Sequence, residues 1–131
     1  MAKVTFYDAE MDWLLNNPSG TVGRWLSSLG RDIKRLAKAK VGVRTGALRA
    51  SIHMRHFRDP RGQYITVGSD LRYALLHHEG SRPHVITPSR AKLLVFASKG
   101  QIIRAHRVAH PGTRANRYLL EPMITVVAAR A

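Results

Sequence analysis

The sequence predicts an α+β fold, with a long N-terminal amphipathic helix packed on a small antiparallel sheet of hairpins, a C-terminal helix and an extended arm. Three observations support this prediction. Apolar residues recur every three or four positions over residues 19–41, which is typical of a helix with one buried face. Alternating and β-branched residues separated by turn signals follow over 48–109, which is typical of hairpins. Helical spacing of apolar residues returns over 115–129.

Length and charge limit what this fold can be. With 131 residues, the chain is predicted to form a single domain around one hydrophobic core. Its 22 Lys and Arg against 8 Asp and Glu give a formal charge of +14, although Asp8, Glu10 and Asp12 make the N-terminal segment 1–18 acidic. Copies of so basic a domain repel one another unless nucleic acid or an acidic protein surface lies nearby. The absence of cysteine excludes disulfides and thiolate metal sites.

Two helices are predicted before the first hairpin. Asp8 can cap a short helix that ends before Pro18, and Ser19 or Thr21 can cap the long helix. The apolar residues of the long helix fall on one stripe, which is expected to be buried: Val22, Trp25, Leu26, Leu29, Ile33, Leu36 and Ala37. Four aromatic residues are also expected in the core: Trp13, Trp25, Tyr73 and Phe96.

The opposite side of the long helix is strongly basic. Its members, which we call the cationic face, are Arg24, Arg31, Lys34, Arg35 and Lys38. Lys and Arg neutralise phosphates without requiring a particular base sequence, so this face is a candidate surface for DNA or for an acidic partner. The alternative is an ordinary solvated helix face.

The region 48–109 is predicted to contain the sheet. In its first strand Ile52 and Met54 alternate with His53 and Arg55, as expected for a strand with one buried side. The predicted elements are strands over 48–57 and 64–67 around a turn at 59–62, a short helix near 71–78, an arm over 80–92, and strands over 93–96 and 101–108. The arm holds two prolines and three bases, so little internal packing is expected there.

No set of residues has the spacing that catalysis or metal binding requires. His77, His78, Glu79 and His84 suggest a metal site, but the adjacent histidines point about 100° apart on a helix, unlike the four-residue spacing of a zinc-binding helix. Acidic residues are too scarce for paired-carboxylate chemistry, and Ser81 does not lie in a nucleophile elbow. The sequence therefore predicts no catalytic residue, no metal and no cofactor.

Four short segments follow one another in a recognisable order. They are Arg44-Thr45-Gly46-Ala47-Leu48-Arg49 with Ser51 and Ile52, Tyr73-Ala74 with His78-Glu79-Gly80-Ser81, the stretch from Pro83 to Pro88, and His110-Pro111-Gly112-Thr113 with Tyr118-Leu119 and Pro122. Together they resemble the family of small tailed-bacteriophage proteins that join head and tail, complete the tail or serve as minor tail components. The resemblance spans about residues 20–125, which is nearly the whole of a domain of ordinary size.

The resemblance implies a non-enzymatic structural subunit of the phage neck. Such subunits form a ring, here expected to be a hexamer, between the portal end of the head and the tail tube, and DNA crosses the lumen during ejection. Its neighbours would be an adaptor, stopper, tail terminator or tail tube, in a virion assembled in the host cytoplasm. A closed ring needs head-to-tail contacts between copies, for which an extended segment is suited. The candidate inter-subunit residues are Arg82, Pro83, His84, Val85, Ile86, Pro88 and Arg90.

Two hypotheses from other classes stay open. A free-standing basic nucleic-acid-binding protein would use the same cationic face and would lose DNA affinity steeply as salt rises. An enzyme with a histidine metal site would retain metal through purification. No membrane partner is expected, because the longest apolar stretches fall far short of the ~20 residues that a spanning helix needs.

Overall fold

The computed structural model describes residues 2–5 and 7–131. The chain divides into two compact units. Residues 1–74 and 117–131 form the first, which we call the core unit, and residues 75–116 form the second, which we call the ribbon unit. The single domain expected over 1–131 stays a prediction. Among the described residues, no helix is both long enough and apolar enough to cross a membrane.

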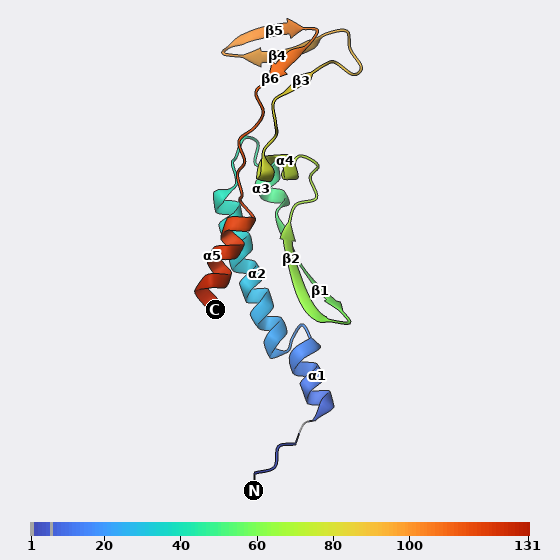
Figure 1. Cartoon of the computed structure of the whole chain (residues 1–131), viewed down its shortest axis with the longest axis vertical. Helices are drawn as coiled ribbons and strands as arrows, with labels where there is room; N and C mark the ends of the chain where they lie inside the picture. The colour runs from blue at the N-terminus through green and yellow to red at the C-terminus, as the bar shows by residue number, and fades with distance from the viewer. Residues whose placement is uncertain (1, 6) are drawn as a thin grey trace. The chain divides into compact units, whose positions relative to one another are not determined.

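The core unit is built around one long helix (Figure 1). Its elements are α1 (Asp8–Asn16), α2 (Thr21–Lys40), α3 (Ala47–Ser51), β1 (His53–Asp59), β2 (Gly62–Gly68) and α5 (Leu120–Arg130). The antiparallel hairpin β1–β2 and the helices α1 and α5 all pack against α2. The α+β class and the packing of the long helix on a hairpin are therefore confirmed.

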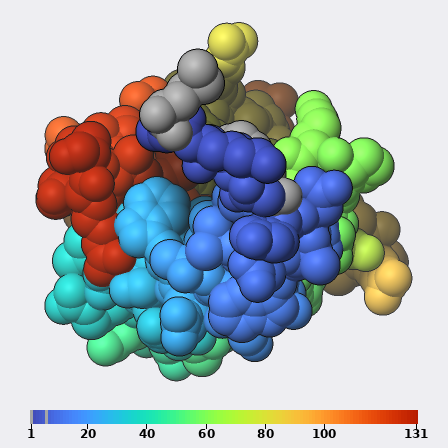
Figure 2. Space-filling view, turned by 90° about the horizontal axis from the view of Figure 1, so that it is seen from below, coloured from blue at the N-terminus to red at the C-terminus, as the bar shows by residue number. Residues whose placement is uncertain are grey.

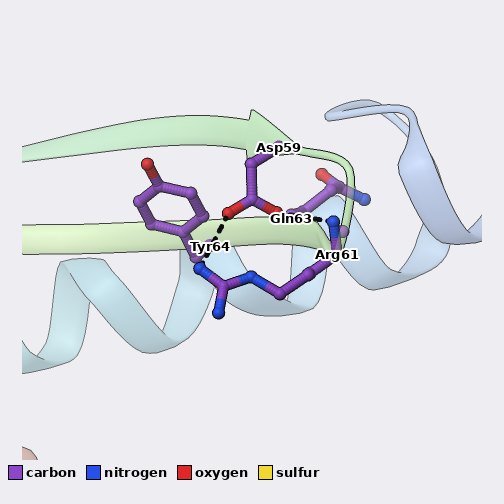
Figure 3. Close-up of a pocket in the computed structure, with 5 residues that line it drawn as sticks. Asp59, Arg61, Gln63 and Tyr64 are labelled. Carbon is purple, nitrogen blue, oxygen red and sulfur yellow. Dashed lines mark hydrogen bonds and ion pairs between the residues drawn. The ribbon is translucent and has the colours of Figure 1, made fainter.

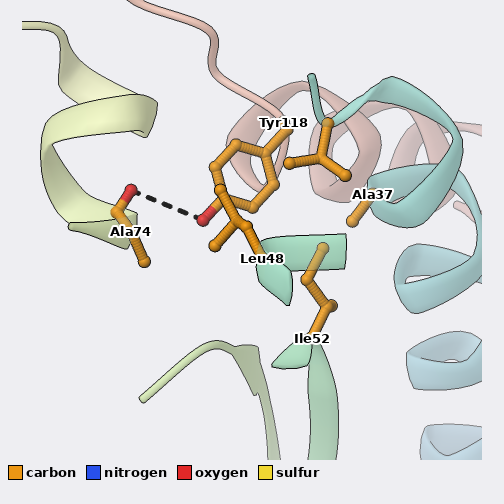
Figure 4. Close-up of a cluster of buried hydrophobic side chains, with 6 residues drawn as sticks. Ala37, Leu48, Ile52, Ala74 and Tyr118 are labelled. Atoms are coloured by element: carbon orange, nitrogen blue, oxygen red, sulfur yellow. Dashed lines mark hydrogen bonds between the residues drawn. The ribbon is translucent and has the colours of Figure 1, made fainter. Parts of the chain in front are cut away.

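Two clusters of buried side chains hold the core unit together. The larger cluster consists of Ala37, Val41, Leu48, Ile52, Ala74 and Tyr118 (Figure 4). Tyr118 is fully buried, and its hydroxyl donates a hydrogen bond of 3.4 Å to the carbonyl oxygen of Ala74. The smaller cluster joins Leu29 and Ile33 of α2 to Val126 of α5. The predicted stripe thus supplies three buried residues, Leu29, Ile33 and Ala37.

The four aromatic residues that were expected in the core are exposed, so that prediction is wrong. The exposed fractions are 49% for Trp13, 49% for Trp25, 48% for Tyr73 and 37% for Phe96. Helical or alternating spacing shows which side of an element is apolar, but it does not show whether another part of the same chain covers that side. Tyr118 is the aromatic side chain that fills the larger cluster.

Several predicted boundaries and caps are corrected by the structure. Residues 47–51 form the helix α3 instead of the start of a strand: Leu48 and Ile52 are buried, whereas Ala50, which a strand would place on the same side, is exposed. The caps proposed at Asp8, Ser19 and Thr21 are wrong, since Tyr7 and Gly20 occupy the N-cap positions without a side-chain hydrogen bond.

The C-terminal helix begins at Leu120 and not near residue 115. Pro122 lies in its first turn, where a backbone N–H has no partner within the helix and its loss costs little.

The ribbon unit contains two short antiparallel ribbons. Strand β3 (His84–Ile86) pairs with β6 (Val108–His110), and β4 (Leu94–Ser98) pairs with β5 (Gln101–Ala105). A further helix, α4 (Ala74–Glu79), spans the boundary between the units. The expected single sheet over 48–109 is therefore three separate two-stranded ribbons, and part of the expected arm over 80–92 is a paired strand.

Glycines fix the base of the ribbon unit. Ser81 and Thr113 exchange two backbone hydrogen bonds, of 2.9 and 3.1 Å. Gly80 and Gly112 flank this bridge, and both have positive φ, 78° and 89°. A Cβ atom at Gly112 would collide with the carbonyl oxygen of Ser81, so the close approach of the two chain segments requires glycine there.

Candidate functional site

Four basic residues of α2 lie around one open depression of the core unit. Spacings of three, four and seven residues place Arg31, Lys34, Arg35 and Lys38 on one side of the helix. Arg49 of α3 joins them, and Ala39 completes the lining. We call this site the basic depression. Arg24, two turns earlier on α2, does not line it.

Arg49 was missed by sequence reasoning. The segment around it was expected to be a strand, in which alternate residues point to opposite sides of a sheet. In α3 it follows the buried Leu48, and this places it on the outer side of a single helical turn. Spacing alone held no signal for it, because Leu48 and Ile52 share a side both in a strand and in a helix.

Acidic residues neutralise little of this charge. Asp32 lies 3.7 Å from Arg35, and it also forms an ion pair with Arg130 of α5. Within the part of the chain that the structure describes, no carboxylate lies within ion-pair distance of Arg31, Lys34 or Lys38. The basic depression therefore keeps most of its positive charge available to an external partner.

The composition of the lining limits the mode of binding. Five Lys and Arg side chains around an open depression suit phosphate oxygens or carboxylates, which they meet by charge and hydrogen bonding. No aromatic side chain lines it, so nucleic-acid bases have no surface on which to stack. An anionic backbone or surface is the ligand class that this chemistry favours.

A second depression lies at the tip of the β1–β2 hairpin (Figure 3). The carboxylate of Asp59 accepts a hydrogen bond of 2.8 Å from the backbone N–H of Arg61 and lies 3.6 Å from its guanidinium group. Tyr64 stacks on Phe57 with ring centroids 5.5 Å apart. The polar groups of Asp59 and Arg61 pair with each other across the turn. None of these side chains forms the pair of a nucleophile and a general base that catalysis would need.

The ribbon unit holds the predicted inter-subunit residues. His84, Val85 and Ile86 form β3, while Arg82 and Pro83 precede it and Pro88 and Arg90 lie in the following loop. No residue of 75–116 is buried. An apolar pocket between the two ribbons is lined by Ile86, Leu94, Val95, Phe96, Val108 and His110.

The histidines take part in local contacts. The Nδ1 atom of His78 lies 2.6 Å from a carboxylate oxygen of Glu79, and the ring of His84 lies 5.0 Å from that of His110. Over residues 2–5 and 7–131, no group of three or more His, Asp or Glu side chains is arranged to hold a metal ion.

Comparison with known proteins identifies a family. The model of the family described as "Bacteriophage HK97-gp10, putative tail-component" matches residues 9–80, which is more than half of the chain and includes α1 from its second residue, α2, α3, the β1–β2 hairpin and α4. The basic depression lies within the matched region. No curated protein and no solved structure matches the chain.

Proposed function

The chain belongs to the HK97-gp10-like family of bacteriophage tail components, and from that premise we propose that it is a ring-forming structural subunit of the phage neck. Family membership confirms the resemblance found in the sequence and makes the chain a structural protein of the bacteriophage particle. The proposed subunit joins head to tail without catalysing a reaction. Copies of it, six in the proposed ring, surround the channel through which the genome leaves the head.

The basic depression is the observation that supports this role. Five bases from α2 and α3 surround it, and Asp32 is the acid that lies beside them. Lys and Arg neutralise phosphates at any base sequence, which suits a surface that DNA must slide past. An acidic surface of an adaptor, stopper, tail terminator or tail tube protein would be held by the same charges.

Salt dependence of DNA binding tests whether the basic depression meets phosphate. The changes are Lys34→Glu, Arg35→Glu and Lys38→Glu together, with Lys92→Glu, Arg107→Glu and Arg114→Glu as the control of equal charge. If the depression contacts phosphates, the first set lowers the slope of log affinity against log salt by roughly 2 to 3, at about 0.9 per phosphate contact. The control set leaves most of the slope, whereas equal losses would show that only net charge matters.

Electron microscopy of negatively stained protein tests the ring directly. The expected result is a closed ring of the purified full chain and recovery of the protein with purified virions. A strict monomer that is absent from particles would contradict the proposed neck subunit.

A free-standing nucleic-acid-binding protein is the second candidate, and the same basic depression favours it. The two candidates differ in what accompanies DNA binding. A monomer that binds DNA through Lys34, Arg35 and Lys38, and that is missing from virions, would support the second candidate over the first.

A further inference from the structure

The helix α1 presents acidic and apolar side chains that the core unit leaves exposed. None of its residues is buried, and Trp13 is 49% exposed. Its inner side is held by two contacts with the hairpin, an ion pair of 3.5 Å between Asp12 and Arg58 and a hydrogen bond from Gln63 to the carbonyl oxygen of Leu15. Figure 2 shows α1 in blue at the surface beside the lighter blue beginning of α2.

Glu10 and Trp13 make this exposed side both acidic and apolar. They are three residues apart, so their side chains are neighbours on one face of the helix. Asp12, which contacts the hairpin, lies about 100° around the helix from Trp13. The helix therefore offers an indole ring and a carboxylate together on the side away from the hairpin.

The β4–β5 ribbon has the opposite charge and a similarly uncovered apolar side. Residues paired across an antiparallel ribbon share a side, so the register Val95↔Arg104 and Ala97↔Ile102 places these four residues together. Leu94 and Phe96 alternate with them and line the pocket shared with the β3–β6 ribbon, and Val95 also lines part of it. Val95 is 62% exposed and Ile102 is 73% exposed, so most of this side, which we call the outer ribbon face, is uncovered within the ribbon unit.

Charge decides which surface fits the outer ribbon face. Residues 75–116 contain seven Lys and Arg and one Glu, a net charge of +6, so two ribbon units repel each other. Residues 1–20 contain one Lys and three acids, a net charge of −2, and are the acidic part of the chain. A two-stranded ribbon with an exposed apolar side is only marginally stable in water, which favours a partner that covers it.

We propose that the exposed side of α1 in one copy packs on the outer ribbon face of a second copy. Trp13 covers Val95 and Ile102, and the carboxylate of Glu10 pairs with the guanidinium group of Arg104. The contact uses two different surfaces of the same chain, and repeated contacts of this kind close into a ring when the rotation between copies allows it. This inference rests on the proposed ring and names the surfaces that join its subunits.

A charge exchange in the full-length protein tests the pairing. Glu10→Arg alone and Arg104→Glu alone each place like charges together and are expected to weaken assembly by about tenfold or more in sedimentation or light-scattering measurements. The double variant restores an opposite pair and is expected to recover most of the wild-type assembly. Arg107→Glu, an equal change of charge two residues beyond β5, is the matched control and is expected to leave assembly unchanged.

Photo-crosslinking identifies the partner independently of these variants. A benzophenone amino acid replaces Trp13 in the full chain, and copies labelled with light and heavy nitrogen are mixed. The proposal expects links between light and heavy copies that end in residues 94–105.

Each other outcome overturns the proposal in a distinguishable way. Rings that survive both single charge changes, or that crosslink elsewhere, overturn the contact and leave the neck ring standing. Links confined to one copy, or a link to another phage protein in virions, assign the outer ribbon face to a different occupant. A wild-type chain that stays monomeric at tens of micromolar overturns the ring and the contact together.

Discussion

Replacing Tyr118 measures how much stability the core unit gains from the packing of its C-terminal segment, residues 117–131, on its other elements. The side chain is fully buried among Ala37, Leu48, Ile52 and Ala74, so Tyr118→Ala leaves a cavity of ring size. Removal of a buried aromatic ring costs about 3–5 kcal/mol of unfolding free energy. Tyr118→Phe keeps the ring and removes the hydroxyl, whose 3.4 Å hydrogen bond to Ala74 is long, so a loss of about 0.5–1 kcal/mol is expected.

Urea unfolding followed by far-UV circular dichroism is the assay, with both variants and the wild type at pH 7. The midpoint should fall in the order wild type, Tyr118→Phe, Tyr118→Ala, while the denaturant slope of the main transition stays constant. A loss of unfolding free energy below about 1 kcal/mol for Tyr118→Ala would refute the packing argument, because removing a ring that is enclosed by other side chains leaves a cavity and costs more than that. A Phe variant as damaged as the Ala variant would show instead that the hydroxyl, and not the ring, holds the segment.

Three further predictions follow from particular contacts. Burial raises the pKa of the Tyr118 hydroxyl, because it favours the neutral form in the folded protein. The stability that the neutral hydroxyl contributes is complete below about pH 10 and is lost as pH rises through the folded-state pKa. Above pH 10, the unfolding free energy of the wild type in urea titrations should therefore fall faster than that of Tyr118→Phe. Gly112→Ala should destabilise the base of the ribbon unit by about 1–3 kcal/mol, because φ is 89° and the new Cβ would collide with Ser81. Amide hydrogen exchange at Ser81 and Thr113 should become faster. Unchanged exchange would contradict this prediction. Asp32→Asn should raise DNA affinity a few-fold at low salt, since it removes the acid beside Arg35, and an unchanged affinity in fluorescence anisotropy would place the DNA elsewhere.

Local patterns predicted α2 and the first hairpin well because their causes are local. The three- and four-residue spacing of apolar residues located α2 to within two residues, and the Asp59–Gly62 turn signal located the first hairpin. Arg31, Lys34, Arg35 and Lys38 were found for the same reason, since a helix places them together whatever surrounds it. Arg49 could not be found in this way, because its place beside them depends on where α3 packs on α2.

The failures have a common physical origin. Trp13, Trp25, Tyr73 and Phe96 were assigned to the core because large apolar side chains are usually buried. A hydrophobic pattern indicates that a side chain is buried, but it does not indicate whether the same chain or another chain covers it. In an assembling subunit, interface residues and core residues therefore have the same signature in the sequence.

The ribbon unit leaves its apolar residues unburied, and this points to the surface that a partner covers. The core unit buries nine hydrophobic residues in two clusters, whereas no residue of 75–116 is buried despite its β-branched and aromatic side chains. Surface ribbons of a monomer are expected to alternate apolar and polar sides, yet the outer ribbon face shows Val95, Ala97 and Ile102 to solvent. If copies cover one another there, a ring in solution should protect the β4–β5 amides from hydrogen exchange while the dissociated Glu10→Arg variant exposes them. Equal exchange in both would mean that the ribbon is stable uncovered, and the apolar residues would then need another explanation.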